Sequence, residues 1–228
     1  MKLSGQQMEF INDNLHRASG LSETRIIETN DPNIMGIMIW NPLMEKDVVL
    51  KCPDHVEKLV ETHLWTHSQE LKSRSPRLLY HIGSNALLVS KLYQCSKCST
   101  EKRHAYDAFY MAHHPEILSQ LQEICLPPFL LFSIAGITRS AYEFIVNLAI
   151  AGTTFREIAT CFDRTHGFHV AVNGKVDEIM DLKHRSPSWM FVQDVFMFDF
   201  RLRLSFYESE MKKITPQEIA IDHTFKTR

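Results

Sequence analysis

Two short motifs are the part of this sequence most able to do chemistry. Cys52 and His55 stand three residues apart in KCPDHVEK, and Cys95 and Cys98 have the same spacing in YQCSKCST. Two intervening residues let one tight turn direct both side chains at a single ion, and thiolates with imidazole are the usual ligands of tetrahedral zinc. Because four protein ligands leave no open position for a substrate, the motifs predict a structural zinc ion.

Other interpretations of these residues stay open. Cys52 and Cys98 could be ordinary half-buried cysteines, with His55 on the surface of a helix. Another histidine could replace His55 as the fourth ligand, namely His63, His67 or His104. The chain has five cysteines, an odd number, and its first residues, MKLSGQQMEF, lack the features of a signal peptide. Both observations argue against a disulfide framework and favour an intracellular, metal-binding protein.

Positive charge is concentrated between residues 71 and 104. This segment holds seven Lys or Arg residues and a single acid, although the whole chain has a formal net charge of -2. Contact with phosphate and a simple solvated surface are both consistent with such a segment. The residues that we expect to contact DNA phosphates are Lys72, Arg74, Arg77, Lys97, Lys102 and Arg103.

The surrounding elements follow from apolar spacing, caps and terminators. Helical patterns extend over residues 4–19, 115–125, 138–151, 153–162 and 186–213. Thr154 and Glu157 have the spacing of a capping box. Residues 21–51 read as extended chain with turns, and NALLVSKLYQ fits a strand that ends at Cys95. In the last helix, the residues spaced for a buried face are Trp189, Phe196, Phe200 and Tyr207.

These elements predict an α+β protein that is mainly α-helical, with a small zinc ribbon followed by a helical domain and a terminal strand. We expect an N-terminal helix and extended segment over residues 1–40, a zinc-ribbon module over 41–110, a helical domain over 111–215 and a further unit from 216 to 228. No apolar run reaches the length of about 18 residues that a membrane span needs, so no membrane association is expected.

The last eleven residues, EIAIDHTFKTR, read as a short apolar strand interrupted by Asp222. A carboxylate that is buried without a partner costs free energy. Asp222 therefore either lies at a strand end near solvent or serves a role such as metal binding. Glu218 would lie on the same strand face but about 13 Å away, too far to share an ion with Asp222.

The order of these motifs resembles the N-terminal part of eukaryotic DDE-type transposases and their domesticated relatives. The shared features are CPxH, an apolar strand, CxxC, a helical segment and finally IAIDHTFK. In such proteins a cysteine ribbon and a helical region precede an RNase H-like core, whose first strand carries the first catalytic carboxylate. The resemblance implies that Asp222 matches this carboxylate and that the ribbon is formed by Cys52, His55, Cys95 and Cys98.

The resemblance also implies a function. The core of these transposases continues beyond its first strand and supplies further carboxylates, whereas this sequence ends six residues after Asp222. Two-metal phosphoryl transfer needs several carboxylates. We therefore expect a truncated fragment that is not an enzyme, binds structural zinc and associates with DNA in the nucleus. The alternative is a zinc-stabilised module for protein–protein interaction, which would bind a protein partner or a second copy of the chain.

Overall fold

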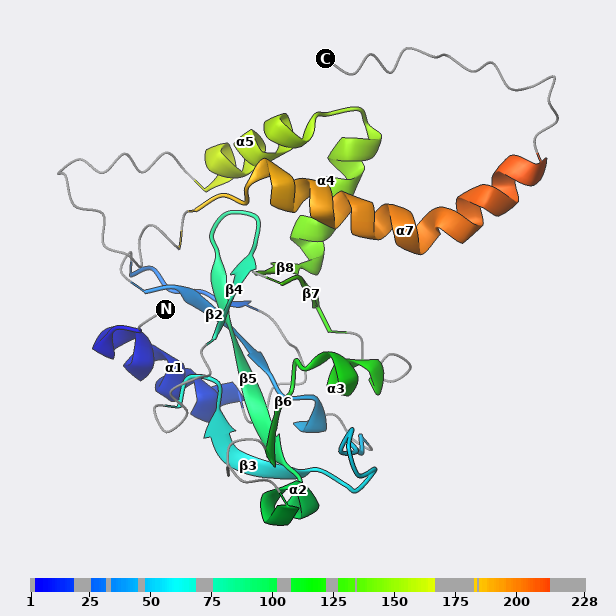
Figure 1. Cartoon of the computed structure of the whole chain (residues 1–228). Coiled ribbons are helices and arrows are strands. Elements are labelled where there is room, and N and C mark those ends of the chain that lie inside the picture. Colours follow the sequence, from blue (N-terminus) through cyan, green and yellow to red (C-terminus); the bar gives the residue numbers. More distant parts are fainter. Residues whose placement is uncertain are drawn as a thin grey trace.

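The structure is a computed structural model and describes residues 3–18, 26–31, 34–44, 48–68, 76–101, 108–121, 127–133, 135–166, 183 and 185–213. In these residues, eight strands form one mixed sheet with six α-helices around it (Figure 1). The strands are β1 (Ile26–Ile27), β2 (Gly36–Trp40), β3 (Val60–Trp65), β4 (Arg77–Tyr80), β5 (Ala86–Gln94), β6 (Phe109–Met111), β7 (Phe129–Leu131) and β8 (Gly136–Thr138). The helices are α1 (Gly5–Ala18), the 3-10 turn η1 (Pro42–Met44), α2 (Ser96–Glu101), α3 (Pro115–Ser119), α4 (Arg139–Ile150), α5 (Phe155–Thr165) and α7 (Trp189–Lys213).

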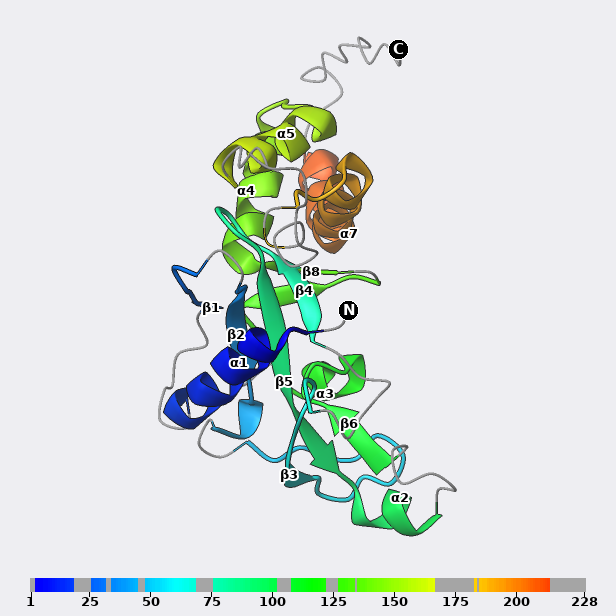
Figure 2. The same cartoon turned by 90° about the vertical axis from the view of Figure 1, so that its left-hand side faces the viewer.

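The long strand β5 is the centre of the sheet (Figure 2). Its sequence, ALLVSKLYQ, is nearly continuous in apolar residues, as expected of a strand covered on both faces, and all of it except Gln94 is buried. The first half of β5 pairs with β2 in parallel and with β4 antiparallel, and the second half pairs antiparallel with β3 and β6. The order along the main path is β1-β2-β5-β4-β8-β7. β5 therefore links the two ends of the sheet.

A glycine permits the close approach of β8 to its neighbours. A Cβ atom at Gly136 would lie 2.5 Å from Cδ2 of Leu79 and 2.7 Å from Cδ2 of Leu131. Carbon atoms in contact are about 3.5 to 4.0 Å apart, so a larger residue would push these leucines away. The missing side chain therefore lets β8 lie between β4 and β7.

The helices cover two regions of the sheet. α1 packs beside β2, where Ile11 is buried in a cluster with Ile37 and Val89. α4, α5 and α7 pack on one another beyond β8 (Figure 1), and their shared core includes Ile137 and Phe162. The predicted capping box of α5 is confirmed, because the side chains of Thr154 and Glu157 each accept a hydrogen bond from the other residue's backbone N–H.

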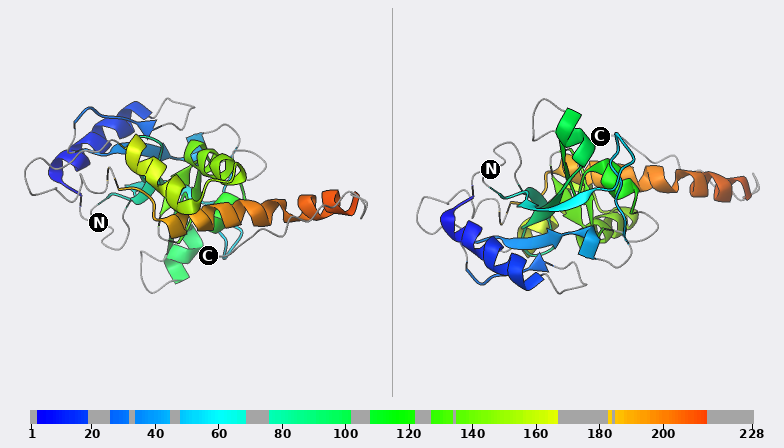
Figure 3. Two further views of the ribbon diagram at one scale, coloured as in Figure 1. Left: turned by 90° about the horizontal axis from the view of Figure 1, so that it is seen from above. Right: turned by 90° about the horizontal axis from the view of Figure 1, so that it is seen from below.

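The predicted aromatic buried face of α7 is wrong. Val192, Val195 and Asp199 are buried instead, whereas 41% of Trp189 and 39% of Phe200 are exposed. Small valines at this face let α7 lie close to α4 and α5, and rings such as that of Phe196 pack at its sides or remain in solvent. Seen from above and below, the C-terminal half of α7 extends past the rest of the fold (Figure 3). The Tyr207 side chain lies outside the described part of the chain.

The buried carboxylate of Asp199 fastens α7 to α4. It accepts hydrogen bonds from the Tyr142 hydroxyl and, at 3.0 Å, from Nε of Arg203. These two donors supply the partners that a buried carboxylate needs.

The predicted fold class, a mainly α-helical protein with a small zinc ribbon, is wrong. The described strands join in one extensive sheet, and the motif cysteines are buried in the same core cluster as Trp40 and Phe129. Most of these strands have six residues or fewer, and pairs such as β4 with β8 are far apart in sequence, so local patterns reveal little of the sheet. The expected strand at 218–228 lies outside the described residues, and the expected domain boundaries stay a prediction. No described helix is long and apolar enough to cross a membrane.

Candidate metal centre

The first pair of candidate ligands stands on a tight loop between η1 and β3. The backbone N–H of Cys52 donates to the carbonyl of Glu57 at 2.7 Å, and the N–H of Val56 donates to the carbonyl of Cys52 at 2.8 Å. These bonds fold the motif back on itself, so that Cys52 and His55 point the same way. The turn requires a positive φ of 59° at Val56, which is an unfavourable conformation for a β-branched residue.

The second pair stands where β5 ends and α2 begins. Cys95 follows the last residue of β5, and Cys98 lies in the first turn of α2. The N–H of Ser99 donates to the Cys95 carbonyl at 3.0 Å, and the N–H of Cys98 lies 3.5 Å from the Cys95 sulfur. This strand-to-helix turn directs both thiols toward the loop that carries Cys52 and His55.

The four ligand atoms of these residues converge on one point. All of them lie within 4.8 Å of one another. The sulfurs of Cys52 and Cys98 are 3.6 Å apart, and Nδ1 of His55 is 3.8 Å from Cys52 Sγ, 3.2 Å from Cys98 Sγ and 3.9 Å from Cys95 Sγ. A tetrahedral zinc ion with bonds of about 2.3 Å to sulfur and 2.0 Å to nitrogen would separate its ligands by about 3.5 to 3.8 Å. The cluster therefore has the dimensions that could hold a metal ion.

Glu101, in the last position of α2, orients the histidine. Its Oε2 atom is 2.9 Å from Nε2 of His55. Because a carboxylate only accepts hydrogen bonds, Nε2 carries the proton and Nδ1 keeps its lone pair toward the cysteines. A carboxylate behind the histidine is a common arrangement at metal sites, where it fixes the ring and strengthens the ligand.

Tyr110 of β6 closes the inner side of the cluster. Its hydroxyl oxygen is 3.5 Å from the Cys52 sulfur and 3.4 Å from the Cys98 sulfur, and it donates to Oδ2 of Asp54 at 2.8 Å. All three cysteines are at most 1% exposed. The Tyr110 hydroxyl and the Asp54 carboxylate are thus polar neighbours of thiols that lie in an apolar core cluster.

The surroundings change the acidity of the thiols in opposite directions. Burial opposes ionisation of Cys52, but hydrogen bonds with Tyr110 and His55 lower the pKa of its thiol to about 6. Burial raises the pKa of the Cys98 thiol to about 11. A hydrogen bond with Cys52 raises the pKa of His55, and Glu101 adds to this effect. Metal binding requires deprotonated thiolates and a neutral imidazole, so at neutral pH it must release the proton that Cys98 retains.

The structure brings together all four residues that the sequence motifs predicted as metal ligands. The other histidines considered for the fourth position are not in the cluster: His63 is exposed on β3, and His67 is 3.0 Å from Asn12 of α1. His104 lies outside the described residues. Spacing alone did not reveal the contributions of Tyr110 and Asp54. The spacing indicated Glu101 only weakly: it follows Cys98 by three residues, which places the two side chains on the same face of a helix.

The expected DNA-contacting residues do not form one described patch. Arg77 lies on β4 and donates through Nη2 to the carbonyls of Phe132 and Ser133, at 2.8 and 2.7 Å. Lys97 is exposed on α2, beyond the opposite end of β5. Six residues of β5 separate the two positions, a distance of about 20 Å. The remaining members lie outside the described residues: Lys72, Arg74, Lys102 and Arg103. Asp222 and Glu218 lie outside them as well.

Comparison of the chain with protein-family models, curated proteins and solved structures gives no match. The resemblance to transposases therefore stays a prediction, and the metal centre rests on its own geometry.

Proposed function

We propose that the chain is a non-catalytic binding protein whose sheet is held together at one end by a structural zinc ion. The observation that carries this proposal is the convergence of Cys52, His55, Cys95 and Cys98 at distances close to the edges of a zinc tetrahedron. Three thiolates and one imidazole favour zinc among the common divalent ions. Four protein ligands complete its coordination, which favours a structural role over a catalytic one.

The position of the cluster explains what the ion would stabilise. It joins the loop before β3 to the end of β5 and the start of α2, while Tyr110 extends the contact to β6. These segments are separated by about 40 residues of chain between the two cysteine motifs. Zinc in small modules contributes a free energy on the order of 10 kcal/mol, so its removal should loosen this end of the sheet first.

Hydrogen exchange with and without a zinc chelator tests the structural role. The proposal expects faster exchange in residues 48–65 and 86–101 after chelation, with α4 and α5 still protected. As a control, Cys161→Ser changes the half-buried thiol of α5 outside the cluster and should leave the pattern unaltered. An unchanged rate near the cluster, or equal loss of protection throughout the chain, would contradict the proposal.

DNA is the second candidate partner, in the nucleus, as the transposase resemblance implies. The observation in its favour is the exposed Lys97 on the outer side of α2, within the basic segment of residues 71–104. Each neutralised phosphate contributes about 0.9 to the slope of log affinity against log salt, so three or four contacts give a slope near about -3. Fluorescence anisotropy with a labelled duplex measures this slope.

Charge reversal at Lys97, Lys102 and Arg103 should weaken such DNA binding. If the affinity for the duplex is unchanged, or if no duplex binds, a protein partner becomes the better explanation.

A further inference from the structure

The strand β7 lies at an edge of the sheet. In the order of the described strands it is the last, and it pairs only with β8. The N–H of Arg139 donates to the Pro128 carbonyl at 2.8 Å, and the N–H of Phe132 donates to the Ala135 carbonyl at 2.9 Å, with Leu130 opposite Ile137 between them. Backbone groups alternate in direction along an antiparallel strand. The N–H and C=O of Leu131 therefore face away from β8.

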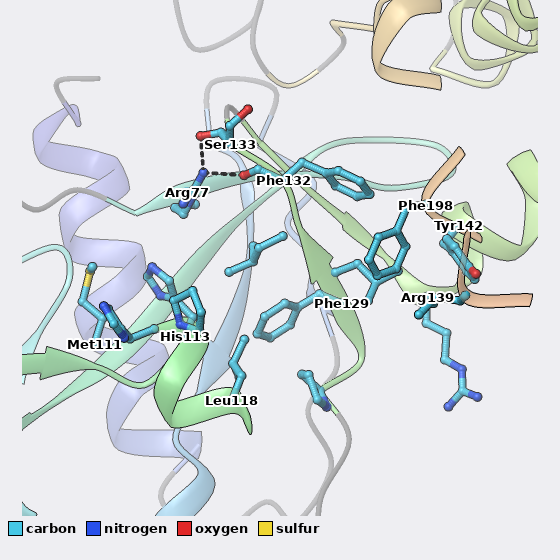
Figure 4. Close-up of a pocket in the computed structure, with 16 residues that line it drawn as sticks. Arg77, Met111, His113, Leu118, Phe129, Phe132, Ser133, Arg139, Tyr142 and Phe198 are labelled. Atoms are coloured by element: carbon cyan, nitrogen blue, oxygen red, sulfur yellow. Dashed lines mark hydrogen bonds between the residues drawn. The ribbon is translucent and has the colours of Figure 1, made fainter. Parts of the chain in front are cut away.

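A groove runs along this edge. It has a volume of about 1010 Å³, and successive residues from Phe129 to Ser133 contribute to its lining. One wall comes from β6, α3 and the segment between them, and the other comes from α4 and α7, as Figure 4 shows for His113, Leu118, Tyr142 and Phe198. Phe129 is buried, whereas Leu131 is half-buried, so Leu131 is the residue whose outward backbone groups can meet a ligand.

The groove is apolar with positive charge. Its basic lining residues are Arg77, Arg139, His113 and His114, and no described Asp or Glu lines it. Arg77 is fixed by its bonds to the β7–β8 turn, and His113 is fixed by the buried Ser90 hydroxyl at 2.6 Å from Nδ1. Arg139 is exposed at the rim, where it pairs with Glu143 of the same helix. The positive charge of these arginines is complementary to a ligand that carries carboxylates.

We propose that the groove binds an extended, acidic segment of another protein, which adds a short strand to the edge at Leu131. Strand addition supplies affinity through main-chain hydrogen bonds and specificity through pockets for alternate side chains. Apolar side chains of the segment would contact Leu118, Phe198 and Leu202, and a carboxylate would approach Arg139. This binding site goes beyond the structural role of zinc, because no cluster residue lines the groove.

A labelled peptide of alternating isoleucine and aspartate is the probe, and its binding to the full chain is measured by anisotropy. Two derivatives carry N-methyl groups on one or the other alternate set of amides. If the peptide adds as a strand, one derivative should bind about fivefold more weakly and the other should bind like the parent, because only one set of amides faces β7. Equal binding of both derivatives would overturn strand addition and favour simple apolar contact.

Substitutions in the protein give an independent test. Leu131→Pro removes the outward N–H of residue 131, which makes no bond to β8, so pairing with β8 is kept. The probe should bind this variant about fivefold more weakly than it binds Leu131→Ala, which keeps the N–H. Arg139→Glu should weaken binding about tenfold, whereas the same reversal at Arg156, an exposed residue on α5 outside the groove, should not.

Three further results would overturn the proposal. One is the absence of probe binding at concentrations up to about 1 mM. The second is equal weakening by Leu131→Pro and Leu131→Ala, which would assign the contact to the side chain. The third is a concentration-dependent dimer in sedimentation that excludes the probe, which would assign the groove to a second copy of the chain.

Discussion

At the residue scale, the metal centre depends on which nitrogen of His55 faces the cysteines. Glu101 accepts a hydrogen bond from Nε2 at 2.9 Å and so leaves Nδ1 as the candidate ligand atom. Without this carboxylate the ring could rotate, or the proton could move to Nδ1, and either change would weaken the metal bond.

Glu101→Ala should therefore lower zinc affinity by about 10- to 100-fold, as expected for loss of a group that orients a metal ligand. Competition with a chromophoric chelator measures the change. Glu57→Ala is the matched control, because Glu57 is an exposed carboxylate that contacts Ser96 rather than a ligand. Equal effects of the two substitutions would show that general charge, and not the bond to His55, matters.

Val56 is strained by the turn that aims His55. Its φ is 59° and its side chain is 68% exposed, so the valine side chain gains little from burial. Val56→Gly should raise the free energy of unfolding by about 1 kcal/mol, because glycine adopts a positive φ without a steric cost. Denaturant titration measures it.

Val60→Gly is the control for the same substitution. Val60 is also largely exposed, at 59%, but it begins β3 with a negative φ. Glycine there should lower the free energy of unfolding by about 1 kcal/mol. A loss of similar size at both positions would contradict the strain at Val56.

At the element scale, His67 connects the end of β3 to α1. It is 8% exposed, its Nε2 lies 3.0 Å from Oδ1 of Asn12, and burial lowers its pKa to about 4. The unfolded chain, with an ordinary histidine pKa of about 6.5, binds this proton at a higher pH than the folded chain does. The stabilisation from neutral His67 is therefore full above pH 6.5 and is lost as the pH falls toward 4.

The free energy of unfolding should fall by up to about 1.4 kcal/mol per pH unit in this window through His67 alone. His67→Gln should remove this part of the pH dependence, which chemical denaturation between about pH 4.5 and 7 measures. His63→Gln, at an exposed site on β3, should leave the dependence unchanged. An identical acid sensitivity in the His67 variant would show that other groups control it.

Elements that are marked by local sequence signals could be predicted, whereas pairings between strands far apart in the sequence could not. The helices α4, α5 and α7 were predictable, because caps such as Thr154 and breaks such as Gly152 are local. The strand that ends at Cys95 was predictable for the same reason. The sheet was not: β8 is three residues long, and its place depends on the missing side chain of Gly136 and on a pairing with β4 that is about 57 residues away.

The same distinction between local spacing and distant contacts applies to the candidate metal centre. The Cys-x-x-His and Cys-x-x-Cys spacings identified all four candidate ligands, whereas Tyr110 comes from a strand that only the fold brings to the cluster. The face of α7 was mispredicted, because aromatic spacing suggested burial while the packed face consists of Val192, Val195 and a bonded Asp199.

At the scale of the whole molecule, the two proposed sites lie in different parts of one sheet. The metal centre is at the end of β5 with α2, and the groove follows β7 beneath α4 and α7 (Figures 1 and 4). The proposed zinc ion would support the fold, and the groove would bind the partner. Loss of the ion should therefore reduce partner binding only to the extent that it loosens the shared core around Trp40 and Phe129.

The metal content of the purified full chain tests the central claim most directly. Elemental mass spectrometry should find one zinc per wild-type chain and per Cys161→Ser chain, because Cys161 lies on α5 away from the cluster. The double variant Cys95→Ser, Cys98→Ser should contain almost none, since serine hydroxyls replace two of the four ligands. A wild-type chain without zinc, or a double variant that retains it, would contradict the account.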